Sequence, residues 1–204
     1  MSGRQRAEKA KRLVAEIERQ LGRAVIVHAF WEAASEIMRQ FAASLRSRDG
    51  RQPRAKALAG VAIIRPSLFF ELALIMTRLH DKDRATASLP NLLACTIDPA
   101  VRKYLLNPQD VDIAAKISDG RRHQVILQRL VRQRDTSFAH FDTAKRGYHY
   151  GPDDATILLQ DTISMFAHLA MAVRGDGGTV VGQWETSRAL AIDFWTLVSE
   201  VKSD

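Results

Sequence analysis

Two residues in the second half of the chain, Arg134 and His140, combine the side chains needed to bind a phosphate and to move a proton. A histidine has an ordinary pKa of about 6.5, so it can give or take a proton near neutral pH. An arginine is always charged and can hold a phosphate through two parallel hydrogen bonds. Arg134 continues a helical apolar face that includes Leu130 and Val131. Because a desolvated charge is costly unless it is paired, Arg134 must either hold a structural partner or accept an anionic ligand.

The spacing of these two residues decides whether they can act together. His140 follows Arg134 by six positions, which on a straight helix places the two side chains roughly 120° apart. The three residues that follow Arg134, Asp-Thr-Ser, favour helix N-caps over helix interiors. We therefore predict that one helix ends near Gln133 and that another begins near Thr136. A kink at this point, or a second copy of the chain, would bring an arginine and a histidine together.

The stretch around Arg134 and His140 resembles the signature of the HEPN superfamily, the higher eukaryotes and prokaryotes nucleotide-binding helical domains. That signature is an arginine followed a few residues later by a histidine, often with a polar residue directly after the arginine. Here Asp135 follows the arginine, and five residues separate it from the histidine. The Arg-Asp opening and the Ala-His-x-Asp ending, together with residues 79–93, resemble the abortive-infection U (AbiU-like) branch. The resemblance extends over roughly residues 30–173.

This resemblance implies a metal-independent endoribonuclease that acts in phage defence or in a toxin–antitoxin system. In the implied mechanism the 2′-hydroxyl attacks phosphorus and the product is a 2′,3′-cyclic phosphate. His140 would transfer the proton, Arg134 would stabilise the charge on the phosphate, and Asp135 would fix their geometry. The implied partners are RNA, a second copy of the chain in a homodimer whose two motifs face each other, and an antitoxin or defence-system protein.

Two features of HEPN domains keep a second function open. Some toxin members carry a tyrosine two residues after the histidine, where a partner nucleotidyltransferase modifies it, but Asp142 stands at that position here. Some HEPN domains also bind without cleaving. The alternative is therefore a non-catalytic HEPN helical module that binds nucleotide, RNA or a partner protein.

Basic residues on the helix that leads into the motif favour an anionic partner. The chain has a net charge of +7 and a pI near 9.9. The arginines that share faces of the predicted helix are Arg121, Arg122, Arg129 and Arg132. We predict that they contact RNA phosphates, and the alternative is a solvated face paired to acidic neighbours. Further candidates for lining the site are Thr136, Asp142, Tyr148 and His149, and the alternative for Tyr148 and His149 is a packing role in a loop.

No other pattern in the sequence predicts a cofactor or a metal site. The Gly-rich stretch 174–182 lacks the Gly-Lys-Ser/Thr of a phosphate-binding loop, and no spacing of His, Cys, Asp and Glu is typical of a metal site. The scattered histidines, among them His80 and His123, are interpreted as structural or surface residues. A single cysteine, Cys95, and an N-terminus without an apolar leader segment predict a cytoplasmic protein.

Apolar residues recur at three- and four-residue steps along the chain, and no convincing alternating strand is present. We predict an all-α, HEPN-like helical bundle with six to nine helices and no significant sheet. Residues 1–204 are predicted to form a single domain. Its parts are a basic amphipathic helix over 1–22, a core that resembles HEPN domains over 23–173, and a C-terminal helix over 183–202. The sequence leaves open whether the first helix continues past Gly22.

Capping and breaking residues predict several helix boundaries. Ser88 is expected to cap a helix, and a short helix is expected over residues 98–106. The most apolar segment, residues 58–76, is interpreted as a loop and a buried core helix that starts near Pro66, with no association with a membrane.

Overall fold

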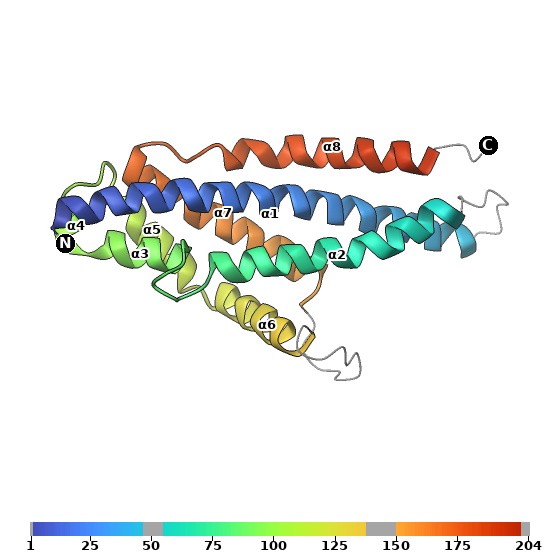
Figure 1. The fold of residues 1–204 in the computed structure, drawn as a ribbon, viewed down its shortest axis with the longest axis horizontal. Coiled ribbons are helices and arrows are strands. Elements are labelled where there is room, and N and C mark those ends of the chain that lie inside the picture. Colours follow the sequence, from blue (N-terminus) through green and yellow to red (C-terminus); the bar gives the residue numbers. More distant parts are fainter. Residues whose placement is uncertain (1, 47–54, 138–149, 201–204) are drawn as a thin grey trace. The chain divides into compact units, whose positions relative to one another are not determined.

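The computed structural model describes residues 2–46, 55–137 and 150–200, and these residues form helices and connecting turns with no β-strand (Figure 1). The all-α prediction with six to nine helices is confirmed, because eight helices lie in this described part of the chain. In chain order they are α1 Gly3–Arg46, α2 Ala55–Leu79, α3 Leu89–Ile97, α4 Pro99–Arg102, α5 Gln109–Ser118, α6 Arg121–Ser137, α7 Pro152–Arg174 and α8 Val180–Glu200.

The helices belong to two compact units. One unit comprises Met1–Ala24 and Ala73–Val181, and the other comprises Val25–Leu72 and Gly182–Asp204. α1, α2 and α8 each contribute residues to both units, whereas α3 to α7 belong entirely to the first. The prediction of one domain over residues 1–204 stays a prediction.

Helix α7 is the centre of the first unit. It contacts α3, α5 and α6, and its buried residues recur at three- and four-residue steps on more than one face. Large side chains on α7 that are fully buried are Leu158, Leu159, Met165, Phe166 and Leu169. Burial of each stabilises the fold by about 1.5–3 kcal/mol relative to exposure. The predicted apolar face of α1 is confirmed in this unit, with Val14, Ile17 and Leu21 fully buried.

Both ends of α7 are set by local residue chemistry. Pro152 occupies its first turn, and Asp153 and Asp154 follow, where negative charge suits the helix N-terminus. At the other end Gly175 adopts a left-handed conformation with φ of 84°, and its N–H donates to the Met171 carbonyl. A glycine is favoured there because a side chain would strain this backbone conformation.

The helix predicted over residues 98–106 is shorter in the structure. It begins as expected, because the Asp98 side chain accepts a hydrogen bond from the Ala100 N–H at 2.8 Å, but α4 is only a single turn. The Leu106 N–H donates to the Ala172 carbonyl of α7 at 2.8 Å. A hydrogen bond to the end of α7 replaces the helical one, so the chain leaves the helix early.

Helix α1 is continuous over 44 residues. The sequence left open whether the N-terminal helix continues past Gly22, and it does. A glycine in a helix interior costs about 1 kcal/mol relative to alanine. Leu21 and Ala24 flank this glycine and are both fully buried, so their burial offsets the cost.

The prediction for residues 58–76, a loop followed by a buried core helix, is wrong in two respects. α2 covers the whole range and holds Pro66 in its interior. Val61, which is 3% exposed, packs in the core of the second unit, and such burial offsets the proline cost of about 3 kcal/mol. The helix is also less buried than predicted, since Ile63 is 73% and Leu74 is 53% exposed.

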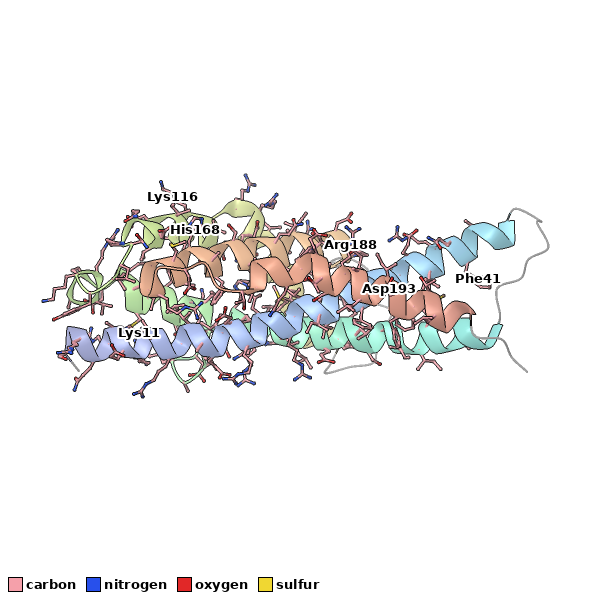
Figure 2. The ribbon with its side chains drawn as sticks, turned by 90° about the horizontal axis from the view of Figure 1, so that it is seen from above. Lys11, Phe41, Lys116, His168, Arg188 and Asp193 are labelled. Carbon is pink, nitrogen blue, oxygen red and sulfur yellow. The ribbon has the colours of Figure 1, made fainter. Side chains whose placement is uncertain are left out.

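The core of the second unit is small and built largely from alanine. Its buried residues are Ala29, Ala33, Ala34, Val61, Ala191 and Trp195. The indole N–H of Trp195 donates to the Phe30 carbonyl at 3.0 Å, which satisfies the polar edge of a buried ring. Arg188 of α8, labelled in Figure 2, lies 3.8 Å from the Glu32 carboxylate of α1.

Two helices are long and apolar enough to cross a membrane by length and composition alone. They are Ala59–Leu79 and Pro152–Arg174, and 22% and 56%, respectively, of the apolar 18-residue window in each is buried. Core helices of soluble proteins share this length and composition, and α7 is such a core helix in the first unit. The finding covers the described residues only.

Replacing Pro66 with alanine should stabilise the protein. Inside α2 a proline removes one backbone hydrogen bond and crowds the preceding turn, so we expect the free energy of unfolding to rise by about 1–3 kcal/mol. The matched control is Pro90→Ala, because Pro90 lies in the first turn of α3, where proline is favourable. Urea denaturation followed by circular dichroism measures both. A Pro66→Ala protein that is no more stable than wild type would contradict a helix through residue 66.

Candidate functional site

Helix α6 carries Arg134 and the arginines predicted to contact RNA. It is unbroken to Ser137, so the helix break predicted after Gln133 is wrong. That prediction assumed that Asp135 would accept hydrogen bonds from backbone N–H groups and start a new helix. Its carboxylate instead binds the guanidinium of Arg134, so it does not cap the backbone and the helix continues through it.

A hydrogen-bonded ion pair orients Arg134. Its Nε and Nη2 donate to Oδ1 of Asp135 at 2.8 and 2.6 Å. The two side chains are 38% and 56% exposed, so the pair contributes only about 0–1 kcal/mol to stability. The pair chiefly fixes the orientation of the guanidinium, because a single carboxylate oxygen accepts both hydrogen bonds from one of its edges. Among the described residues no group accepts a hydrogen bond from Nη1, so this donor remains for an anion.

Arg134 lines one end of a groove in the first unit with a volume of about 710 Å³. The groove lies between α3 and α6, and residues from the ends of α2 and α5 complete it. Its apolar lining is Pro90, Leu93, Ala94, Ile97, Leu127 and Val131. Its charged lining is Asp81, Lys82, Asp119, Arg132 and Arg134. The predicted apolar face of α6 is thus divided, since Leu130 is buried in the core and Val131 lines the groove with Arg134.

Two buried histidines, His80 and His123, line the same groove, and their ring centroids are 5.0 Å apart. Nε2 of His80 lies 2.9 Å from the Thr162 hydroxyl, a hydrogen bond. Nδ1 of His123 lies 3.6 Å from the Asp161 carboxylate, which is too long for a hydrogen bond. Burial lowers the pKa of His80 to about 3, and burial also lowers the pKa of His123, although Asp161 opposes that shift. Both imidazoles are therefore neutral at pH 7.

Two of the four predicted RNA-contacting arginines pair with carboxylates of α7. Nη2 of Arg122 donates to Asp161 at 2.8 Å, and Nη1 of Arg129 donates to Asp154 at 3.1 and 3.2 Å. In the structure Arg122 and Arg129 are therefore paired to acidic neighbours, as the alternative interpretation expected. Both side chains remain partly exposed, at 68% and 42%, so contact with RNA phosphates stays a prediction for them.

The other two arginines are placed differently. Arg132 is exposed and lines the groove two positions before Arg134, and Arg121 is exposed at the first residue of α6. Arg132 is therefore the one predicted RNA-binding residue that shares the groove with Arg134. Its contact with RNA also stays a prediction.

A family model described as AbiU2, of the HEPN class, matches residues 7–186, which is most of the chain. The chain belongs to the AbiU2 family of HEPN domains. The predicted resemblance to the abortive-infection U branch is confirmed, and the match extends beyond residues 30–173 in both directions. No curated protein and no solved structure matches the chain.

The rest of the HEPN signature lies outside the described residues. The predicted site residues concerned are His140, Asp142, Tyr148 and His149. Thr136 belongs to α6, and its side chain lies outside the description as well. The chain is described again from Tyr150, which is buried and whose N–H donates to Oε1 of Gln133 at 2.9 Å. This bond ties the residue that follows the His140 segment to the last turns of the helix that carries Arg134.

Sequence reasoning missed the two histidines of the groove. His80 and His123 are structural residues, as predicted, but they also share a surface with Arg134 in this HEPN domain. No spacing rule links them, because they lie on different helices far apart in the chain. The one available signal was that His80 directly follows a helix end within the stretch that resembles the AbiU-like branch.

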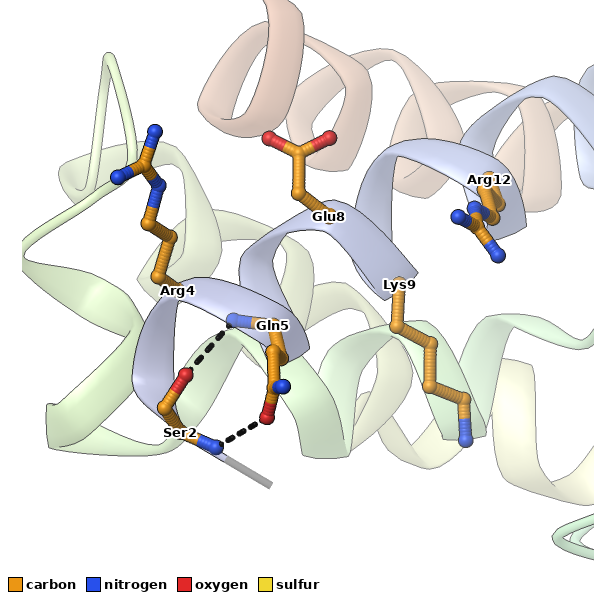
Figure 3. A pocket seen from close by; sticks show the side chains of 6 residues that line it. All are labelled: Ser2, Arg4, Gln5, Glu8, Lys9 and Arg12. Atoms are coloured by element: carbon orange, nitrogen blue, oxygen red, sulfur yellow. Dashed lines mark hydrogen bonds between the residues drawn. The ribbon is translucent and has the colours of Figure 1, made fainter.

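A second hollow, of about 510 Å³, lies over the first turns of α1 (Figure 3). It is lined by Ser2, Arg4, Gln5, Glu8, Lys9 and Arg12. The Ser2 N–H donates to the Gln5 side chain at 2.8 Å, and the Gln5 N–H donates to the Ser2 hydroxyl at 3.3 Å, which caps the helix reciprocally. Three cationic side chains against one carboxylate make this surface positive, so it adds to the general attraction for anions. These six residues include no group suited to proton transfer near neutral pH.

The neutral, buried His80 should make stability depend on pH. Its pKa is about 6.5 in the unfolded chain and about 3 in the folded one, so the unfolded chain binds more protons between these values. Stability therefore falls as the pH falls from about 6.5 towards 3, and His80 alone should account for about 2 kcal/mol at pH ~5. Replacing His80 with glutamine should reduce the difference in free energy of unfolding between pH ~7.5 and ~5, measured by urea denaturation.

His28 provides the comparison for this experiment. Burial lowers its pKa to about 4, so it adds a similar pH dependence that remains in the His80→Gln protein. The free energy of unfolding of the His80→Gln protein should therefore still depend on pH, but less strongly than that of wild type. An unchanged difference between the two pH values would contradict a neutral His80 in the folded state.

Proposed function

We propose that this AbiU2-family HEPN domain is a metal-independent endoribonuclease that cleaves RNA through attack of the 2′-hydroxyl on phosphorus. The observation that carries the proposal is the Arg134–Asp135 pair beside the groove on α6, in a HEPN chain whose signature includes His140. The reaction removes a proton from the 2′-hydroxyl, gives a proton to the leaving 5′-oxygen and places extra negative charge on the phosphoryl oxygens. The products are a 2′,3′-cyclic phosphate and a 5′-hydroxyl.

Each residue of the motif has a role in this reaction. The guanidinium of Arg134 donates to the phosphoryl oxygens, where the negative charge increases in the transition state. Asp135 holds one edge of that guanidinium and so limits its orientations. His140 moves the proton, since an imidazole is effective near neutral pH. Arg134 is a better choice than a lysine here because its planar donors match two phosphoryl oxygens at once.

The proposed active form is a homodimer. One chain supplies one Arg134 and one His140, while protons must move at two different oxygens of the substrate. Two copies supply two imidazoles, so one can act as the base at the 2′-oxygen and the other as the acid at the 5′-oxygen. The partial exposure of Arg134, at 38%, leaves its side chain able to meet a partner copy or a substrate.

We place this activity in the cytoplasm, in phage defence or in a toxin–antitoxin system, with an antitoxin or another defence protein as the partner. The resemblance to the abortive-infection U branch supports this setting. Asp142 occupies the position at which some toxin members carry a modifiable tyrosine, so regulation by nucleotidyl transfer at that position is not part of the proposal.

The decisive experiment is cleavage of a single-stranded RNA in excess EDTA. Wild type should cleave it, and His140→Ala should lower the rate by at least about a hundredfold while RNA affinity stays nearly unchanged, because a neutral imidazole adds little to phosphate binding. Activity that needs Mg²⁺, or that survives His140→Ala, would contradict the mechanism. If wild type cleaves no RNA and cells tolerate its expression, the non-catalytic binding module is the better description.

Substitutions of the ion pair should separate charge from geometry. Arg134→Lys keeps the charge but loses the planar donors, so we expect a loss of rate of about a hundredfold with a small loss of affinity. Asp135→Asn keeps an oxygen acceptor at the same place, so its effect should be milder, about tenfold or less. Single-turnover cleavage rates and fluorescence anisotropy measure the two quantities. A larger rate loss for Asp135→Asn than for Arg134→Lys would show that the carboxylate itself takes part in proton transfer.

The two classes of arginine on α6 should differ in their effect on RNA binding. Arg132 lines the groove, so Arg132→Ala should weaken binding of a nuclease-dead protein and lower the slope of log affinity against log salt by about 1. Arg122 lies outside the groove lining, so Arg122→Ala is the matched control on the same helix and should change that slope less. Equal effects of both substitutions would mean that the groove is not the path of the RNA.

A further inference from the structure

The groove beside Arg134 is chemically different at its two ends. Along α6 it runs from His123 and Gln124 to Arg132 and Arg134, which is eleven positions and a distance of about 16 Å on an α-helix. The end near the C-terminus of α6 carries two guanidinium groups. The other end is bordered by two buried imidazoles, His80 and His123, whose ring centroids are 5.0 Å apart. The charged side chains of Asp81, Lys82 and Asp119 also line the groove.

The lining between these ends is apolar and accessible. Ala94 of α3 is exposed and borders the groove, as do Leu127 and Val131 of α6, which are partly buried. Gln128 of α6 also lines the groove and is exposed. Its side-chain amide makes no hydrogen bond to another described residue. A primary amide in this position offers both a donor and an acceptor to a ligand.

We infer that this groove is a nucleobase subsite, in which a base of the RNA next to the phosphate held by Arg134 lies between α3 and α6. The inference rests on the proposed function, and it assigns the part of the substrate that the groove recognises. A nucleobase is flat and apolar on its faces and carries hydrogen-bonding groups on its edge, so it matches the apolar walls and the amide of Gln128. Its phosphates match Arg132 and Arg134 by charge.

The size and charge of the groove favour a nucleotide over a protein occupant. A volume of about 710 Å³ is in the range typical of sites for small ligands, roughly 300–1,000 Å³. A helix from a second copy or from a partner would need a long apolar stripe, whereas this groove ends in charged groups. His80 and His123 are buried, at 7% and 2% exposure, so they border the groove without adding charge to it.

The test uses the His140→Ala protein, which should not cut its ligand, and a fluorescent single-stranded hexaribonucleotide in which one base at a time is removed. Ala94→Trp fills the groove from an exposed position, and Gln128→Leu removes the amide from another exposed position. Val125→Trp adds the same bulk to a part of α6 that does not line the groove, since Val125 is 40% exposed and lies outside the lining. Circular dichroism melting of each variant confirms that it folds.

Removal of one particular base should weaken binding to the parent protein by about tenfold, as burial of a base edge and face would require. Ala94→Trp and Gln128→Leu should each weaken binding of the intact RNA, and removal of that same base should then have little further effect. Val125→Trp should behave as the parent. If wild type cleaves RNA, but removal of each base weakens binding equally in the parent, Ala94→Trp and Gln128→Leu proteins, the subsite is overturned. The proposed ribonuclease activity is then unaffected.

Other outcomes separate the remaining explanations. Base-specific binding that depends on Ala94 and Gln128, without any cleavage by wild type, would support the subsite and overturn the proposed catalysis. No RNA binding by the parent at any salt concentration would overturn both. A change in light-scattering mass on Ala94→Trp, from dimer to monomer, would mean that a second copy covers the groove, and would overturn the subsite.

Discussion

The way α6 is fastened to α7 determines the site. Two arginines of α6, Arg122 and Arg129, pair with carboxylates of α7, and they are seven positions apart and therefore on one helical face. Ile126 and Leu130 on nearby positions are buried, at 4% and 1% exposure. Apolar burial supplies most of the stabilisation, because the ion pairs are partly exposed and contribute about 0–1 kcal/mol each. The ion pairs and the buried side chains together set the rotation of α6 about its axis.

Once that rotation is set, the neighbouring face of α6, about 100° around the helix axis, lines the groove. Leu127, Val131 and Arg134 follow one another at steps of four and three, so they lie in one row along that face. The Arg134–Asp135 pair then works at the end of this row, with its carboxylate partner one position away on the same helix. The hydrogen bond from the Tyr150 N–H to Gln133 is made to the same helix. A shift of α6 on α7 would therefore move Arg134, Asp135 and the other α6 residues of the site together.

Much of the architecture could be predicted from one sequence. Helical periodicity, caps and breakers predicted the all-α class and the approximate ends of α7, because these depend on interactions within a few residues. Ser88 stands directly before α3 as predicted, but its side chain makes no capping hydrogen bond. Predictions failed where distant burial outweighed local preference. Pro66 lies inside a helix, since buried neighbours offset a cost of about 3 kcal/mol. The predicted helix break beside Asp135 failed because a side-chain ion pair took the carboxylate that was expected to cap the backbone.

For the site, the sequence by itself determined the motif, Arg134, Asp135 and His140, because the chemistry of a short motif depends only on residue types and their spacing. The HEPN membership followed from the same local pattern. The sequence did not determine which arginines of α6 are already paired, because their partners Asp154 and Asp161 lie on another helix. The sequence also did not predict that His80 and His123 both line the groove, because this depends on α2 ending beside α6. Only the tertiary structure decided these points, because contacts between residues far apart in the chain depend on how the helices pack, and local periodicity carries no information about that packing.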